Sequence, residues 1–123
     1  MSNRVMLVED DEEIQMVLGQ LLSMEGYEVQ TARDGRAALD MLRQGAAPGV
    51  VLLDLMMPVM DGWAVRREMQ ADPALREVHV IVRSGVVDLA APQPALQDAE
   101  VLLKPLDLDV LLESVARHCA ARA

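Results

Sequence analysis

A chain of 123 residues is long enough to bury a single core, so we expect residues 1–123 to form one domain. Its formal net charge of −9 argues against direct nucleic-acid binding, which needs a basic surface to displace counterions. No apolar stretch approaches the length of a membrane span, and no signal-peptide pattern opens the chain. Together with a single cysteine, Cys119, these features predict a cytoplasmic protein with no internal disulfide and no membrane contact.

Short apolar runs alternate with amphipathic stretches along the chain. The runs predict five buried strands, in chain order Arg4–Val8, Tyr27–Thr31, Val50–Asp54, Val78–Val82 and Val101–Leu103. The first amphipathic stretch predicts a helix with one apolar face, formed by Ile14, Val17, Leu18, Leu21 and Leu22. Asp34 and Asp61 stand where the next two helices are expected to begin.

Strands that alternate with helices in this way predict an α/β fold, with one doubly wound parallel sheet of five strands and helices on both faces. The stretch from Val86 to Ala99 departs from the pattern because it contains Pro92 and Pro94. A proline inside a helix costs about 3 kcal/mol. We therefore expect helix 4, between the fourth and fifth strands, to be short or irregular.

Acidic residues follow two of the predicted strands. Glu9 and Asp10 come directly after Val8, and Asp54 closes the strand that begins at Val50. Ligand sites in parallel α/β sheets lie beyond the carboxyl ends of the strands, so the three side chains should lie close together if these strands are neighbours. Because like charges at short range repel strongly, this arrangement predicts a bound cation among the carboxylates.

Two further polar residues lie at the carboxyl ends of predicted strands. Ser84 ends the fourth strand, and Lys104 ends the fifth. Taken alone, each has an ordinary interpretation, Ser84 as a turn residue and Lys104 as a surface lysine. Their coincidence with the three carboxylates at one edge of one sheet favours a functional site over these separate interpretations.

At this point the sequence resembles the receiver (phosphoacceptor) domain of two-component response regulators. The resemblance runs over nearly the whole chain and rests on the stretches Val5–Asp11, Gly26–Ala32, Leu52–Gly62, Ser84–Gly85 and Leu103–Pro105. It implies a flavodoxin-like sheet with the strand order 2-1-3-4-5. It also implies a signalling domain that catalyses only its own phosphorylation and dephosphorylation.

The resemblance implies a metal site at the carboxylates. Asp54 is the expected phosphoacceptor, in a reaction that depends on Mg²⁺. Glu9 and Asp10 are expected to hold the ion, Asp10 more directly and Glu9 through water, with Asp54 and the backbone carbonyl of Met56 as further ligands. Mg²⁺ prefers oxygen ligands of this kind and usually takes one or two carboxylates.

The resemblance also implies roles for the remaining polar residues. Ser84 is expected to donate its hydroxyl to a phosphoryl oxygen, and Lys104 to pair with the phosphoryl charge. Pro105 is expected to follow a cis peptide bond that directs Lys104 into the site.

The expected partners are proteins. They are a histidine kinase or phosphotransfer protein, docking near Ile14 and Val17, and a downstream protein target. The domain is expected to be a monomer or a weak phosphorylation-dependent dimer. Whether the 123 residues are a stand-alone regulator or one domain of a longer protein stays open.

Several positions depart from the receiver pattern. Val101 stands where many receivers carry an aromatic residue that turns inward during activation, which puts that form of the switch in doubt. Arg83 occupies a commonly apolar position. Because a buried arginine needs a partner, we hypothesise that it reaches the rim of the site and pairs with an acid. Met56 and Val86 replace polar residues that often position an attacking water, which predicts slow self-dephosphorylation.

Three other functions compete with this interpretation. A phosphorylation-independent interaction module would use the receiver scaffold without its chemistry. An aspartate-nucleophile phosphatase of the haloacid dehalogenase type needs a second aspartate two residues after the nucleophile, where this chain has Met56. A flavin-binding flavodoxin-like domain needs a phosphate-cradling loop after the first strand, where this chain has carboxylates that repel phosphate.

Overall fold

The computed structural model describes residues 3–84, 99–104 and 107–121. Five strands form one parallel sheet in the order β2-β1-β3-β4-β5, with the bounds β1 Arg4–Val8, β2 Glu28–Ala32, β3 Val50–Asp54, β4 Val80–Ser84 and β5 Glu100–Leu103. The described residues also form the helices α1 Glu12–Met24, α2 Gly35–Arg43, α3 Gly62–Ala71 and α4 Leu108–Ala121. The predicted fold class and strand order are confirmed.

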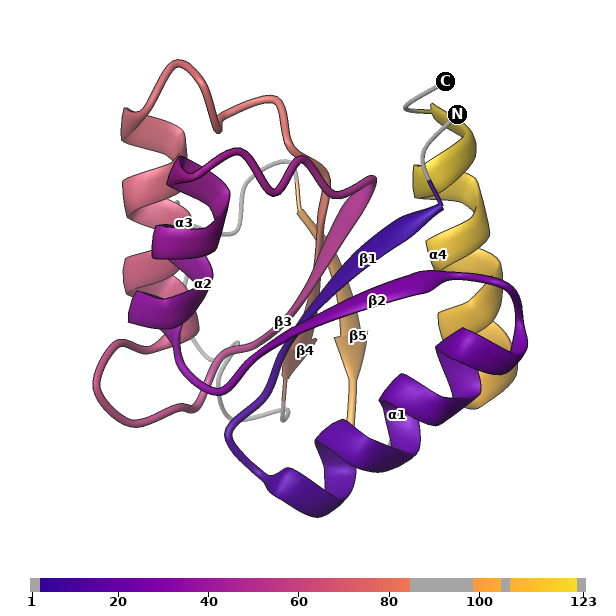
Figure 1. Ribbon diagram of the computed structural model, residues 1–123. Helices are drawn as coiled ribbons and strands as arrows, with labels where there is room; N and C mark the ends of the chain where they lie inside the picture. The colour runs from indigo at the N-terminus through magenta and orange to yellow at the C-terminus, as the bar shows by residue number, and fades with distance from the viewer. Residues whose placement is uncertain (1–2, 85–98, 105–106, 122–123) are drawn as a thin grey trace.

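Helices cover both faces of the sheet (Figure 1). On the α2 and α3 side the buried core includes Leu39 and Leu53, and on the α1 and α4 side it includes Leu22, Leu52 and Leu111. Neighbouring residues of a strand point to opposite faces, which is why Leu52 and Leu53 serve different cores. All five residues of β3 are buried. A central strand covered on both faces is therefore a continuous apolar run until it reaches Asp54.

Aspartates begin the first three helices. The Asp11 side chain accepts hydrogen bonds from the backbone N–H groups of Glu13 and Ile14, at 2.9 and 3.1 Å. The side chains of Asp34 and Asp61 each accept one from the third residue after them. Both predicted helix starts are confirmed. Asp11 belongs to the helix start as its N-cap, which leaves Glu9 and Asp10 alone between β1 and α1.

Besides one-residue shifts in the bounds of β2 and β5, two predicted features differ in the structure. β4 begins at Val80 and not at Val78, because the N–H of Val78 bonds back to the Leu75 carbonyl in a turn. The apolar face predicted for α1 is narrower than five residues, since Leu18 and Leu22 are buried whereas Val17 is 59% exposed. The helix expected to be short or irregular falls on residues 85–98, outside the described part of the chain.

Candidate functional site

The first two carboxylates lie just beyond the end of β1. Glu9 is buried and Asp10 is exposed. The Glu9 N–H donates to the carbonyl of Ala32, the last residue of β2, at 3.0 Å. From α1, the side-chain amide of Gln15 donates to the carbonyls of both Glu9 and Ala32, at 3.1 and 3.3 Å. Gln15 thereby ties the ends of two strands together and orients the backbone that carries the carboxylates.

The third carboxylate ends the central strand. Asp54 is 4% exposed, and its Oδ1 accepts hydrogen bonds from Lys104 Nζ at 3.1 Å and from the Met56 N–H at 3.3 Å. Lys104 follows β5, and its backbone N–H donates to the Ser84 carbonyl at 2.8 Å. Asp54 is thus a buried carboxylate in direct contact with an ammonium group.

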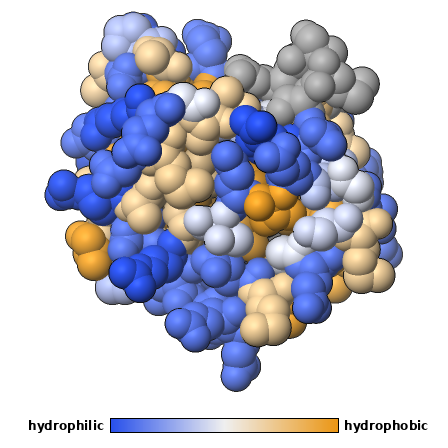
Figure 2. Space-filling view, viewed as in Figure 1, coloured by the Kyte–Doolittle hydropathy of each residue, from blue (hydrophilic) through white to orange (hydrophobic). Residues whose placement is uncertain are grey.

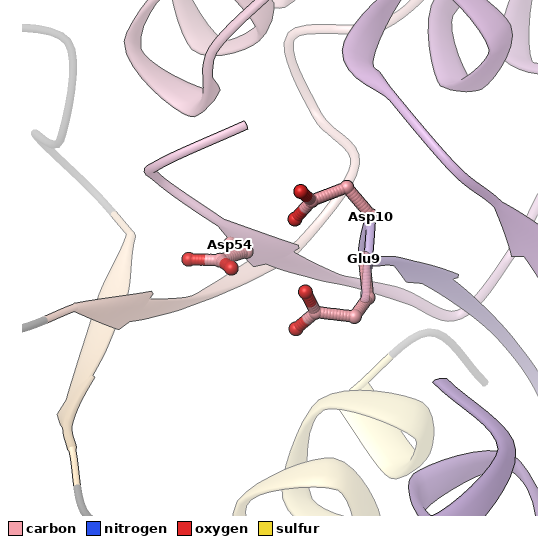
Figure 3. A group of neighbouring side chains, drawn as sticks. All are labelled: Glu9, Asp10 and Asp54. Carbon is pink, nitrogen blue, oxygen red and sulfur yellow. The ribbon is translucent and has the colours of Figure 1, made fainter. Parts of the chain in front are cut away.

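The structure brings the three carboxylates together. One oxygen from each of Glu9, Asp10 and Asp54 can be chosen so that all three lie within 4.8 Å of one another. In Figure 3 the side chains of Glu9 and Asp10 project toward the side on which Asp54 lies. They meet because β1 and β3 are neighbours in the sheet, with Val8 paired to Leu53. Three ionised carboxylates at this separation repel one another unless positive charge lies nearby.

Two basic side chains supply part of that charge. Arg83 Nη1 forms an ion pair with Glu9 Oε1, and Lys104 Nζ lies against Asp54 Oδ1. Three carboxylates and two cations leave one net negative charge. Arg83 does pair with an acid, as hypothesised, but its side chain is 7% exposed, so the expected position at the rim is wrong. Arg83 is paired with Asp54 in the sheet register, and its side chain reaches the buried carboxylate of Glu9 instead of the rim.

Glu9 is the member of the cluster whose ionisation its surroundings oppose. Burial raises the pKa of Glu9 above its ordinary value of 4.5, and the charge of Asp54 raises it further. Hydrogen bonds from the Asp11 N–H and from Arg83 lower this pKa, but the net direction is upward. Ionisation of Glu9 is therefore less favourable in the folded protein than in the unfolded chain, even with Arg83 beside it.

The described residues fit a magnesium site by their donor set. Carboxylate oxygens are hard ligands, and Asp10 opens the cluster to the solvent that supplies the waters Mg²⁺ usually keeps. Met56 donates its N–H to Asp54 and is 58% exposed. That the Met56 carbonyl binds the metal ion stays a prediction. Ser84 is fully buried at the end of β4, and the role of its hydroxyl likewise stays a prediction. The cis peptide before Pro105 lies outside the described residues.

Comparison with known proteins gives the family of the chain. The model of the response regulator receiver domain matches residues 5–116. The chain belongs to this family. It is 38% identical over 114 residues to the response regulator PleD of Caulobacter vibrioides, which covers 91% of the chain and 25% of PleD. It is 27% identical over 118 residues to sporulation initiation phosphotransferase F of Bacillus subtilis, which covers 96% of the chain and 94% of that protein.

Solved structures agree with this family. A CheY-like receiver domain from Methanospirillum hungatei JF-1 superposes with a TM-score of 0.81 at 29% identity, covering 95% of this chain and 94% of that one. This receiver domain spans about a quarter of the length of PleD. Family membership makes the chain a receiver domain of two-component signalling and not a stand-alone enzyme, which removes the phosphatase and flavin-binding alternatives.

Among the residues that the structure describes, no helix is long and apolar enough to cross a membrane. Hydrophilic side chains cover most of the face shown in Figure 2, and apolar side chains form smaller separate areas on it.

Sequence reasoning missed one residue that shapes this site. Gln15 reads as an ordinary polar residue of a surface helix, and its two hydrogen bonds to strand-end carbonyls depend on how α1 lies against the sheet. A weak signal existed, because Gln15 stands three residues before Leu18 and seven before Leu22, which places it on the helix face that turns toward the sheet. The identity of the acid that pairs with Arg83 had no local signal, since Glu9 lies 74 residues earlier in the chain.

Proposed function

We propose that this receiver domain accepts a phosphoryl group from a histidine kinase, or from a phosphotransfer protein, onto Asp54 in a magnesium-dependent reaction. The observation that carries the proposal is the setting of the Asp54 carboxylate. It is buried at the end of the central strand, shares a cluster with Glu9 and Asp10, and contacts Lys104 Nζ at 3.1 Å. Phosphoryl transfer depends mostly on positioning and on charge neutralisation, and these neighbours supply both.

Glu9, Asp10 and Asp54 would hold the Mg²⁺ ion, with the backbone carbonyl of Met56 as a further ligand. The two buried carboxylates and the exposed one offer oxygen ligands together with access for water. When bound, the ion neutralises charge on the phosphoryl group.

The groups of the protein carry the transfer itself. An oxygen of Asp54 attacks the phosphorus in line, so that a P–O bond forms while the P–N bond to the donor histidine breaks and its electron pair leaves with the imidazole. Lys104 pairs with the phosphoryl charge, and the Ser84 hydroxyl donates to a phosphoryl oxygen. Water later hydrolyses the acyl phosphate. Because Met56 offers no polar side chain to orient that water, we expect this hydrolysis to be slow, with a phosphoryl lifetime well beyond seconds.

The phosphoryl donor is proposed to dock near Ile14 and Val17. Both residues line an open groove of about 270 Å³ that also includes Arg83 and Leu108, so it lies between α1 and the start of α4. Val17 is 59% exposed, and exposed apolar residues in a groove suit a protein partner.

The remaining parts of the proposal concern the whole domain. Residues 1–123 form one receiver domain that works in the cytoplasm, as a monomer or a weak phosphorylation-dependent dimer, and acts on a downstream protein through altered contacts. The second candidate function is a phosphorylation-independent interaction module. One observation favours it: Val101, half-buried against the α2 and α3 core, offers no ring to report the state of the site.

The test is phosphorylation by acetyl phosphate with Mg²⁺, followed by intact mass. The wild type should gain one phosphoryl group, and the gain should disappear in EDTA and in Asp54→Asn. Asp61→Asn is the matched control, because it removes an acid outside the cluster while an asparagine still caps α3. A phosphoryl group that persists in Asp54→Asn would contradict the assignment of the acceptor. A wild type that shows neither a phosphoryl adduct nor a Mg²⁺-dependent response to beryllofluoride would favour the interaction module.

A further inference from the structure

The ion pair between Arg83 and Glu9 is an unusual feature of a cation site. Both side chains are buried, at 7% and 2% exposure, and Arg83 Nη1 contacts Glu9 Oε1 directly. Arg83 belongs to β4 and Glu9 follows β1, so the pair reaches past β3, the strand that ends in Asp54. A permanently charged guanidinium therefore lies at the buried side of the three-carboxylate cluster.

Both carboxylate oxygens of Glu9 already have partners. Oε1 is paired with Arg83, and Oε2 accepts a hydrogen bond from the Asp11 N–H at 3.2 Å. A metal ion that uses Glu9, directly or through a water, must share or displace one of these partners. It must also approach a positive charge that cannot be lost by deprotonation.

We propose that Arg83 is a built-in counter-ion that competes with Mg²⁺ for Glu9 and so lowers the metal affinity of this domain. The inference rests on the proposed function, since it assigns Arg83 a part in the same metal site. Arg83 stabilises the metal-free cluster by offsetting one of its three negative charges, and the same charge opposes the ion that would replace it. Arg83 is therefore a positioning and affinity-setting residue and not a ligand.

The position of Arg83 also connects the metal site to the groove on α1. Its side chain lines that groove together with Glu13, Ile14 and Val17. If Mg²⁺ displaces the Arg83 guanidinium from Glu9, the positive charge that lines the groove is free to pair with Glu13, a second carboxylate of the lining. Metal binding at one end and partner binding at the other thus involve one arginine.

The test is the dissociation constant for Mg²⁺ in the whole chain, followed by Trp63 fluorescence and by the Mg²⁺-dependent rise in unfolding temperature. Arg83→Met keeps an unbranched stem but removes the charge, and it should bind Mg²⁺ at least about tenfold more tightly, equivalent to about 1.4 kcal/mol. Arg83→Gln removes the charge but can still donate a hydrogen bond to Glu9. It replaces the methionine variant if that variant does not fold, and it should also bind Mg²⁺ more tightly than the wild type. Arg83→Lys keeps the charge and should stay within about threefold of the wild type.

Arg66→Met is the matched control. Arg66 is a second buried arginine, 3% exposed, on α3 at the opposite face of the sheet, so its removal changes the net charge equally. It should lower stability without tightening Mg²⁺ binding. Equal or weaker Mg²⁺ binding in Arg83→Met, with saturable binding in the wild type, would overturn this inference alone. No saturable binding in any variant would overturn it together with the proposed metal site.

Discussion

At the scale of single residues, Gln15 supports the site without belonging to its chemistry. Its amide joins the carbonyls of Glu9 and Ala32, the two strand ends that carry the first carboxylates. Replacing it with methionine keeps the length of the side chain and removes both donors. We expect Gln15→Met to lower the free energy of unfolding by about 1 kcal/mol, the usual net value of a hydrogen bond, because the Ala32 carbonyl keeps a second donor in the Glu9 N–H.

The same variant should weaken Mg²⁺ binding, because Glu9 and Asp10 lose the anchor that holds their backbone. Urea unfolding and a Mg²⁺ titration measure the two effects. Gln20→Met is the control, since Gln20 is exposed on the same helix. If Gln15→Met and Gln20→Met behave alike in both measurements, Gln15 has no positioning role.

At the scale of elements, the start of α3 lies directly against the segment that follows β3, the strand that ends in Asp54. A Cβ at Gly62 would lie 2.7 Å from the Asp54 carbonyl oxygen and 2.7 Å from Leu55 Cα, both backbone atoms that cannot turn aside. We expect Gly62→Ala to lower the free energy of unfolding by about 2 kcal/mol or more through this overlap, and to weaken Mg²⁺ binding by moving Asp54.

Gly19→Ala, on another helix, is expected to stabilise the protein where Gly62→Ala destabilises it. Gly19 is inside α1, and a Cβ there meets nothing within 4 Å. Alanine should raise the free energy of unfolding by about 0.5–1 kcal/mol, because glycine loses more backbone freedom in a helix. Chemical denaturation of both variants tests the pair. Equal effects of the two substitutions would show that the close approach at Gly62 is relieved at no cost.

The local sequence pattern predicted a helix or strand well where burial of apolar residues alone determines it. β3 is buried on both faces, so its apolar run and its abrupt end at Asp54 were both legible in the sequence. The burial of Arg83 and Ser84 at the end of β4 was not, because it depends on contacts with distant parts of the chain. Val17 belongs to the same predicted apolar face as the buried residues Leu18 and Leu22, but it lies at the edge of that face away from Leu22 and is exposed.

At the scale of the whole molecule, the net charge of −9 includes two carboxylates, Glu9 and Glu100, whose pKa values are shifted in opposite directions. Burial raises the pKa of Glu9, and the charge of Asp54 adds to the effect. Glu100 is also subject to burial, which opposes ionisation, but hydrogen bonds from His118 and Arg117 outweigh it and lower the pKa of Glu100. The two residues lie at opposite ends of the sheet, Glu9 beyond the end of β1 and Glu100 at the start of β5, so their contributions can be separated.

The signs of the two contributions follow from linkage. A raised pKa means that folded Glu9 holds its proton more tightly than the unfolded chain, so its stabilising contribution is complete below about 4.5 and is lost as the pH rises through the folded pKa. A lowered pKa means the reverse for Glu100, whose contribution is present above about 4.5 and is lost as the pH falls.

Glu9→Gln and Glu100→Gln test these signs in urea unfolding of the metal-free protein at a series of pH values. Relative to Glu9→Gln, the wild type should lose stability as the pH rises from about 4.5 toward neutrality, whereas relative to Glu100→Gln it should lose stability as the pH falls below about 4.5. Added Mg²⁺ should reduce the first loss, because a bound cation offsets the charge of Glu9, and should leave the second unchanged. Slopes of the same sign for both variants would show that the surroundings of Glu9 do not oppose its ionisation.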